Sequence, residues 1–462
     1  MNKTILLLLF MTLAGSAFAQ NMFRTACQGN LARLDSLLED TSVNTQDFRG
    51  RSLLHWAVAC RQKEVFDYLV EKGIDINLED HDQETPLHMA VRFDNEEYFN
   101  QLVDLQPNQD WIEAYGPSLM QKAVLKESQA FIKLLLAHGV DIDARNDRGS
   151  TPLEIASRIG ATAIADSLLH LGANPDKVRT IEVFGDYMGP ERPEETPLIF
   201  APNFISTEEY EFGSVFSADG KEFFYGVDVN GKAETRYSKL EGERWSEPVI
   251  ILSHERYGYN DPFLSPDENR LYVISPMAMD GVGEPKDYDI WYIERTEEGW
   301  SEPINAGPNI NSAGNEYYIS FTKDGTMYFS SNANAPEGEE GNYDIYYSKY
   351  KNGEFQEPIV LGDAINASGY DADVFIDPDE SYIIFCSTRE EGLGRGDLYI
   401  SFKNEDGSWT DAVNMGAPTN TVHHELCPFV TKDGQYFFYT SDQDIYWVST
   451  TIFDELRDQS KE

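Results

Sequence analysis

The sequence predicts a multidomain protein of the α plus β type, in which a solenoid of helix pairs precedes an all-β propeller. Two internal repeats support this prediction. Four alanines, Ala57, Ala90, Ala123 and Ala156, stand 33 residues apart in the first third of the chain. In the remainder, five turn motifs centred on an aspartate recur 48 to 57 residues apart. Repeats of these lengths are typical of solenoids and propellers rather than of one globular core.

Residues 1–19 have the features of a secretory signal. Lys3 precedes an apolar run over residues 5–13, and Ala17-Phe18-Ala19 then supplies the small-residue pattern of a cleavage site. The apolar run is far shorter than the roughly 20 residues of a transmembrane helix, and no later segment approaches that length. We therefore expect an exported protein, periplasmic or extracellular, with no membrane span.

The first repeat predicts pairs of helices over residues 20–180. In its clearest unit, Thr85-Pro86-Leu87-His88-Met89-Ala90 opens one helix and residues 96–105 form a second. The same frame recurs at Ser52, Ser118 and Thr151, and a shorter unit covers residues 23–38. Glycines end the second helix in three units (Gly73, Gly139 and Gly172), where a left-handed residue is expected. Gln106 replaces this glycine in the third unit, so an irregular helix end is expected there.

These units resemble ankyrin repeats, which implies about five repeats and a protein partner bound on their concave face. The resemblance also implies that His55 and His88 hydrogen-bond a neighbouring turn rather than bind a ligand. Five residues that the repeat frame does not require are expected at the turn tips, namely Phe48, Arg49, His81, Tyr115 and Arg148. Aromatic and arginine side chains dominate the energetics of protein interfaces. We therefore predict that these five bind the partner.

The second repeat predicts propeller blades over residues 195–452. Each unit has a turn such as Ser217-Ala218-Asp219-Gly220, an aromatic-rich strand, a polar loop and a strand of the type Asp344-Ile345-Tyr346. An element such as Trp300-Ser301-Glu302-Pro303 closes the unit. Four strands in about 54 residues are typical of a blade. The unit resembles the WD40-like (PD40) repeat of TolB-type propellers from bacterial envelopes.

The two ends of the second repeat predict the number of blades. The fifth unit ends after Trp447 without an outer strand, whereas the residues from Pro197 to Ser206 reproduce the spacing of an outer strand. We therefore expect five blades, with the N-terminal segment completing the last one, and six blades as the alternative. Residues 181–194 are predicted to be a linker and residues 453–462 a C-terminal tail.

The net charge of −44 falls mainly on the second half, where residues 181–462 carry 19 Lys and Arg against 55 Asp and Glu. Such a surface disfavours nucleic acid and favours cations and basic proteins. Adaptation of the whole protein to a salty habitat is an alternative explanation. The four cysteines form a pair in each half, Cys27 with Cys60 and Cys386 with Cys427, which leaves either disulfides or buried thiols open.

Carboxylates recur on one predicted face of the propeller. Four of them stand six residues before a turn motif, and a fifth lies two positions further along in the second blade. These are Glu211, Glu316, Asp371 and Glu425, with Asp261 as the fifth. If they gather near the axis, they predict a site for a cation such as Ca²⁺ or for a basic ligand. The alternative is that each caps its own strand by hydrogen bonds and faces solvent separately.

The sequence therefore favours an exported, non-catalytic scaffold that binds proteins. The alternative is a glycoside hydrolase or carbohydrate-binding protein, because five-bladed propellers of the arabinanase and related families carry catalytic carboxylates in a central cavity. A sugar-binding propeller would use exposed rings such as Tyr257, Tyr259, Tyr317 and Tyr370. His423 and His424 are metal-ligand types, but strand alternation sends neighbours to opposite faces, so we do not expect them to bind zinc together.

Overall fold

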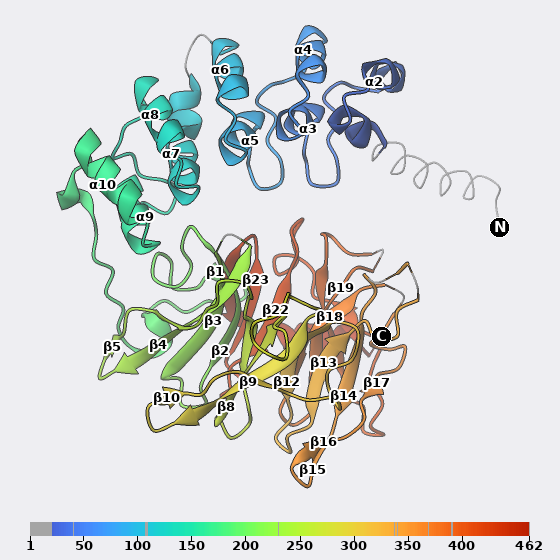
Figure 1. The fold of residues 1–462 in the computed structure, drawn as a ribbon. Helices are drawn as coiled ribbons and strands as arrows, with labels where there is room; N and C mark the ends of the chain where they lie inside the picture. Colours follow the sequence, from blue (N-terminus) through green and yellow to red (C-terminus); the bar gives the residue numbers. More distant parts are fainter. Residues whose placement is uncertain are drawn as a thin grey trace, which may run out of the picture. The chain divides into compact units, whose positions relative to one another are not determined.

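A computed structural model describes residues 21–461 except 40, 107–109, 230, 337, 340, 368 and 390. The predicted signal, residues 1–19, lies outside the described residues. The chain divides into two compact units, residues 1–180 and residues 181–462. Within the described residues, no helix combines the length and apolar character needed to span a bilayer. Figure 1 shows the helices of the first unit and the strands of the second.

The first unit consists of helix pairs. Residues 21–27 are helical and precede α2 (Leu31–Leu38). The pairs that follow are α3 (Leu53–Ala59) with α4 (Lys63–Glu71), α5 (Pro86–Arg92) with α6 (Glu96–Asp104), α7 (Asp110–Leu125) with α8 (Gln129–Ala137), and α9 (Pro152–Arg158) with α10 (Thr162–Leu171). The four alanines of the 33-residue repeat are fully buried. Small side chains at these positions let the paired helices approach closely.

Local sequence fixes the helix ends as predicted. A capping box formed by Thr151 and Glu154 opens α9 and satisfies amide groups that a helix start leaves unpaired. Gly73, Gly139 and Gly172 have positive φ values of 76°, 96° and 106°. This conformation is inexpensive for glycine and costly for other residues. The prediction of left-handed ends at these three glycines is confirmed.

The second unit is a five-bladed propeller, which confirms the predicted fold. From the inner strand outward, the blades are β2 (Tyr210–Phe216), β3 (Glu222–Val229), β4 (Lys232–Glu241) and β6 (Val249–Leu252); β7 (Asn260–Leu264), β8 (Arg270–Ser275), β9 (Asp289–Thr296) and β11 (Ile304–Asn305); β12 (Glu316–Phe321), β13 (Met327–Ser331), β14 (Asp344–Ser348) and β17 (Ile359–Val360); β18 (Asp371–Ile376), β19 (Tyr382–Ser387), β20 (Asp397–Phe402) and β21 (Val413–Asn414); and β22 (Leu426–Val430), β23 (Tyr436–Ser441), β24 (Asp444–Ser449) and β1 (Leu198–Ile199). Short strands β5 (Arg244–Trp245) and β10 (Gly299–Trp300) pair with β4 and β9, and β15 (Tyr350–Lys351) pairs with β16 (Glu354–Phe355).

The last blade is closed by the N-terminal strand, as the spacing of prolines predicted. Strand β1 pairs antiparallel with β24, with Leu198 opposite Trp447 and Ile199 opposite Tyr446. Behind this pair, the ring of Phe200 is fully buried and lies 5.3 Å from that of Trp447. Strand β1 thus supplies the fourth strand of this blade and covers the outer edge of β24. An uncovered edge could pair with a strand of another molecule.

The predicted linker contacts the propeller, and the predicted tail is largely helical. In residues 181–194, the indole nitrogen of Trp245 donates to the carbonyl oxygen of Gly185 at 2.8 Å, and the hydroxyl of Tyr187 donates to Asp433 at 2.6 Å. Residues 452–459 form helix α11 (Ile452–Gln459), whose Phe453 and Leu456 are buried. The apolar residues of this helix alternate with charged ones, so the sequence did not indicate a helix that packs on the propeller.

Candidate functional site

The inner strand of every blade carries a β-bulge at the same position. The bulged residue has a positive φ in all five blades and lies six positions before the aspartate of the following turn. These residues are Gly213, Asp261, Tyr318, Asp373 and Cys427, and the strand register shifts beside each of them. A bulge redirects a side chain out of the regular alternation of a strand. The repeat therefore places five unlike residues at one level of the ring.

The bulged residues meet across the propeller axis. Sγ of Cys427 lies 3.3 Å from Oδ1 of Asp261, although the second and fifth blades are not neighbours in a ring of five. The hydroxyl of Tyr318 donates to the carbonyl oxygen of Pro428 at 2.9 Å. A Cβ atom on Gly213 would lie 2.9 Å from Oδ1 of Asp261, so glycine leaves room for this carboxyl group. The structure therefore places Asp261 at the axis, as predicted for this one carboxyl.

A polar pocket of about 460 Å³ lies beside this level, with Asp261, Asp373, His424, Tyr317 and Tyr370 in its wall. Burial, together with the negative charge of Asp373, raises the pKa of Asp261 to about 7. Burial also raises the pKa of Asp373 to about 6, against the effect of the Tyr370 hydroxyl, which donates to its Oδ2 at 3.0 Å. Burial lowers the pKa of His424 to about 4, so its imidazole is neutral at neutral pH.

The tyrosines and the carboxyl groups near this pocket bear on the two carbohydrate alternatives, sugar binding and glycoside hydrolysis, respectively. Two of the four tyrosines expected to serve as exposed stacking platforms, Tyr257 and Tyr259, are buried with 0% and 4% exposure. Tyr257 is held by the carbonyl oxygen of Gly283, to which its hydroxyl donates at 2.5 Å. A glycosidase needs one carboxyl group as acid and another as base or nucleophile, with pKa values set apart by their environments. The pKa values of Asp261 and Asp373 are both raised, instead of one being raised and the other kept low. The hydrolase alternative therefore stays a prediction.

The other four predicted carboxyl groups do not gather at the axis, which corrects the proposed five-carboxylate cation site. Glu211, Glu316, Asp371 and Glu425 are buried with at most 1% exposure. Each accepts a hydrogen bond from the residue four positions earlier, for example from the hydroxyls of Ser312 and Thr421 at 2.6 Å. They lie two positions before the bulge, on the side of the strand that faces a neighbouring blade. The structure therefore shows the hydrogen bonds of the alternative prediction, but the four carboxyl groups are buried instead of facing solvent.

Each of these four carboxyl groups instead lies beside the aspartate that begins the third strand of the preceding blade. The negative charges of Asp444, Asp289, Asp344 and Asp397 raise the pKa values of Glu211, Glu316, Asp371 and Glu425, respectively. Burial is the larger cause of the rise in every case, and it brings the pKa of Glu211 to about 8. A neighbouring negative charge disfavours the charged form of a buried carboxyl group. The four carboxyl groups thus lie at four separate boundaries between blades.

Three of the predicted partner-binding residues of the first unit lie on two adjoining turns. Phe48 is 62% exposed, and the guanidinium carbon of Arg49 lies 5.7 Å from the centre of its ring. The next turn follows directly, because the backbone amide of His81 donates to the carbonyl oxygen of Arg49 at 2.9 Å. A Cβ atom on Gly50 would lie 2.7 Å from the His81 ring, so this glycine permits the close approach. The structure brings Phe48, Arg49 and His81 together.

Tyr115 and Arg148 differ in position from these three. Tyr115 lies within helix α7 rather than at a turn tip, because this helix begins at Asp110, eight residues before the Ser118 motif. Its hydroxyl donates to Glu79 at 3.2 Å, and its ring meets the edge of His88 at 5.4 Å. The expected position of Tyr115 at a turn tip is therefore wrong, since helix replaces the turn. Arg148 does lie in a turn, where its side chain is half-buried.

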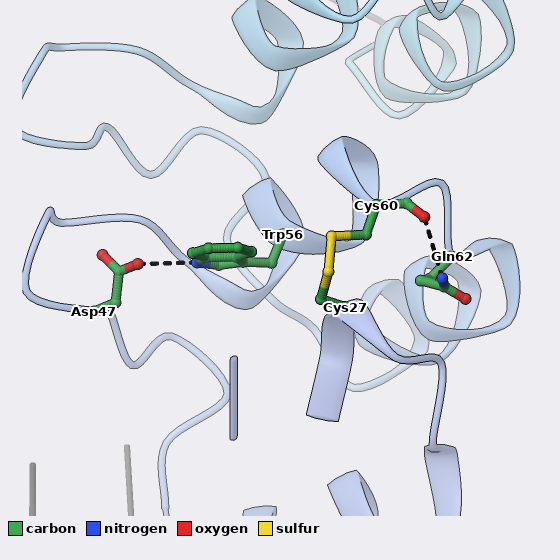
Figure 2. Close-up of a disulfide and its surroundings, with 5 residues drawn as sticks. All are labelled: Cys27, Asp47, Trp56, Cys60 and Gln62. Atoms are coloured by element: carbon green, nitrogen blue, oxygen red, sulfur yellow. Dashed lines mark hydrogen bonds between the residues drawn. A yellow bond between two sulfur atoms is a disulfide. The ribbon is translucent and has the colours of Figure 1, made fainter. Parts of the chain in front are cut away.

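A pocket of about 640 Å³ lies next to Phe48, with Phe23, Arg24, Asp47 and Trp56 also in its wall. The indole nitrogen of Trp56 donates to Oδ2 of Asp47 at 2.9 Å, which fixes the ring at this edge (Figure 2). Sequence reasoning did not select Trp56, because it follows the histidine of the repeat signature and resembles an ordinary helix residue. The exposed Phe48 and the half-buried Trp56 together make this part of the surface aromatic.

A disulfide between Cys27 and Cys60 lies beside the same pocket and joins the first two helix pairs (Figure 2). The amide nitrogen of Gln62 donates to the carbonyl oxygen of Cys60 at 3.1 Å. Cys386 and Cys427 of the second unit are buried free thiols. The two alternatives left open for the cysteines are therefore realised in different halves of the chain.

Comparison with known families decides the nature of the helix pairs. A family profile described as "Ankyrin repeats (3 copies)" matches residues 22–112, and one described as "Ankyrin repeats (many copies)" matches residues 120–169. Residues 22–112 and 120–169 are ankyrin repeats. This confirms the resemblance drawn from the 33-residue spacing.

Curated relatives are similar to a limited part of the chain. Rabankyrin-5 of Mus musculus is 30% identical over 158 residues, covering 29% of this chain and 14% of the relative. The probable 26S proteasome regulatory subunit p28 of Saccharomyces cerevisiae is 28% identical over 132 residues, covering 28% of this chain and 58% of the relative. The human neurogenic locus notch homolog protein 1 is 32% identical over 122 residues, covering 26% of this chain and 5% of the relative. The chain thus spans between a twentieth and about three fifths of these relatives.

The two histidines of the repeat signature, His55 and His88, have structural roles. Nδ1 of His55 accepts from the backbone amide of Ser52 at 3.0 Å, and its Nε2 donates to the carbonyl oxygen of Glu84 in the next repeat at 2.9 Å. His88 makes the corresponding contact with the hydroxyl of Ser118 at 2.9 Å. Both imidazoles are buried. The prediction that these histidines bond a neighbouring turn is confirmed for His55, whereas His88 bonds a residue of helix α7. The ankyrin repeats imply a scaffold for protein–protein interaction.

Proposed function

We propose that this protein is an exported, non-catalytic scaffold that binds a protein partner through the turn tips of its first ankyrin repeats. The observation that carries the proposal is the exposure of Phe48, at 62%, beside Arg49 and above an aromatic pocket. Large exposed aromatic and arginine side chains beside a preformed hollow are typical of the centre of a protein interface. The partner's chemistry should include an acidic or carbonyl group for Arg49 and an apolar side chain for the pocket.

Two observations support export. Residues 1–19 have the pattern of a secretory signal, and Cys27 and Cys60 form a disulfide. Disulfides persist in the periplasm and outside the cell, whereas the reducing cytosol opposes them. An envelope protein is therefore the proposed partner, and the acidic propeller adds a second surface on which a basic partner would be favoured.

The proposal can be tested by capture from an envelope extract with the full-length mature protein, followed by mass spectrometry. We expect one protein to be retained by the unmodified chain and its retention to fall at least about tenfold for Phe48→Ala, because truncation of a central interface residue costs 2 kcal/mol or more. The matched control is Phe93→Ala, because Phe93 is an aromatic residue of another repeat with 42% exposure.

Equal loss of the partner in the Phe48 and Phe93 variants would place the contact elsewhere on the ankyrin repeats. If no protein is retained by the unmodified chain, the scaffold proposal fails. The propeller pocket should then be tested for binding and hydrolysis of polysaccharides.

A further inference from the structure

Three side chains with different metal-binding atoms meet on one side of the axial pocket. Asp373 is the bulged residue of β18, Cys386 lies in the adjacent strand β19, and His424 lies just before β22 of the next blade. A carboxylate oxygen, a sulfur and an imidazole nitrogen from these residues all lie within 4.8 Å of one another. The cluster combines residues from two blades, so no sequence motif announces it.

The distance between two of the donor atoms suits a tetrahedral ion. Sγ of Cys386 lies 3.3 Å from Nε2 of His424. In a tetrahedral site, bonds of about 2.3 Å to sulfur and about 2.0 Å to nitrogen place these two atoms about 3.5 Å apart. The side chains are thus within a few tenths of an ångström of the separation that such an ion requires.

Gly396 makes the room in which the imidazole and the thiol approach each other. A Cβ atom at this position would lie 2.5 Å from a ring carbon of His424 and 2.9 Å from Sγ of Cys386. Gly396 is not among the glycines with positive φ, so its backbone conformation does not require glycine. Its carbonyl oxygen accepts from the amide of Glu425 at 2.9 Å, which fixes the chain beside His424. The absence of a side chain at 396 is therefore explained by the space that the two donors occupy.

Tyr370 contacts two members of the cluster, Asp373 and His424, and helps to orient them. Its hydroxyl donates to Oδ2 of Asp373 at 3.0 Å, and its ring meets that of His424 edge-on at 6.0 Å. A hydrogen bond of this kind to one carboxylate oxygen leaves the other to bind metal and fixes its direction. Asp373 and His424 also line the axial pocket, whereas Cys386 is fully buried behind them. Water or a small ligand in the pocket can therefore supply a fourth donor.

We propose that Asp373, Cys386 and His424 bind a divalent transition-metal ion of the zinc class, with the fourth coordination position facing the axial pocket. Sulfur and imidazole nitrogen select such ions over Ca²⁺ and Mg²⁺, which prefer oxygen donors. Binding replaces the S–H bond of Cys386 with a sulfur–metal bond and releases the proton to solvent, with no transfer of electrons. This site is separate from the ankyrin surface and extends beyond the scaffold function.

Cobalt(II) is the probe for the test, because a cobalt–thiolate bond gives a strong near-ultraviolet charge-transfer absorption. The full-length protein is stripped of metal and kept free of reductant, so that Cys27 and Cys60 remain in their disulfide. Among the cysteines, only Cys386 and Cys427 then carry free thiols. We expect one equivalent of Co²⁺ to give the thiolate band, and Zn²⁺ to displace it.

Two serine variants distinguish the proposed site from its neighbour. Cys386→Ser should abolish the thiolate band, whereas Cys427→Ser should retain it, because Cys427 contacts Asp261 and is not one of the three proposed ligands. His424→Gln should weaken metal binding by at least about tenfold. It also provides a second test if the serine variant at 386 does not fold.

The proposal is overturned if neither Co²⁺ nor Zn²⁺ binds at a molar ratio of one, or if the band persists in Cys386→Ser and disappears in Cys427→Ser. X-ray absorption of the zinc-loaded protein gives an independent measure. One sulfur at about 2.3 Å supports the site, and coordination by oxygen and nitrogen alone excludes it.

Discussion

Replacing Glu211 with glutamine should stabilise the propeller near neutral pH. Glu211 is fully buried at the start of the first inner strand, where the Thr207 hydroxyl donates to its Oε1. Its Oε2 has no hydrogen-bond partner among the described residues, and Asp444 of the last blade lies nearby. An amide group keeps an oxygen for Thr207 and adds an N–H that can face Asp444. The substitution therefore removes a buried titration while preserving shape.

The magnitude follows from the pKa of this carboxyl. Burial raises it from 4.5 to about 8, so the native protein holds a proton that the unfolded chain releases between these pH values. The stability that Glu211 contributes is complete below pH 4.5, falls as the pH rises, and is constant again above about pH 8. Each unit is worth about 1.4 kcal/mol, so the loss at pH 7 is roughly 3 kcal/mol. Glu211→Gln should avoid this loss and have little effect near pH 4.5.

The assay is urea unfolding at a series of pH values, followed by pulsed hydrogen exchange and mass spectrometry of peptides from β2 and β24. Peptide-level detection is needed because a chain with two units need not unfold in one step. The matched control is Glu357→Gln, which removes the same charge from an exposed position in the third blade. Its difference from the unmodified protein should vary little with pH.

The reasoning is refuted if the difference between Glu211→Gln and the unmodified protein is the same at about pH 5 and about pH 7.5, where linkage requires a change of a few kcal/mol. Destabilisation by the glutamine at the higher pH would also refute it, because the native carboxyl would then be ionised and well solvated.

Three further outcomes are expected. Replacing Cys27 and Cys60 together by serine should lower the free energy of unfolding of the ankyrin repeats by about 4 kcal/mol, because their disulfide closes a loop with a sequence separation of 33; urea unfolding of ankyrin peptides measures this, and an unchanged midpoint contradicts it. Arg236→Met should destabilise the propeller by about 3 kcal/mol, because it removes the cation that pairs with the largely buried carboxylates of Glu209 and Glu234; urea unfolding of propeller peptides measures this, and an unchanged midpoint would be inconsistent with it. Phe200→Ala should cost about 3–5 kcal/mol through the cavity it leaves beside β1 and β24; hydrogen exchange in β24 checks this, and unchanged protection there would show that β1 does not hold the blade.

The sequence predicted the elements that depend on local chemistry. Each Ala of the 33-residue repeat and each aspartate turn has a requirement that acts within a few residues, so spacing alone revealed the ankyrin repeats and the five blades. The exchange of β1 was predictable because prolines and asparagines recur at matching offsets in outer strands. Tyr115 was misplaced because the frame of the Ser118 motif persists, while a longer helix replaces the turn before it.

The axial site was largely hidden from sequence reasoning. The bulge moves one residue of each inner strand off the regular alternation, whereas the recurring offset before the turn motif selected Glu211 and its equivalents instead of the bulged residues. Those five residues are chemically unlike, and only Asp261 was chosen in advance. Cys386 and His424 come together through pairing between Gly396 and His424 of different blades, which no local pattern encodes.

The pairing of β1 with β24 has a consequence for the order of events in biosynthesis. Leu198 precedes the first blade and Trp447 lies in the fifth, so the ring cannot close until all five blades have been synthesised. Contacts so distant in sequence are slow to form, whereas each ankyrin repeat contacts only its neighbours and can fold as it emerges. Residues 22–169 are therefore able to find their native contacts while the propeller is still an open set of blades with a free edge.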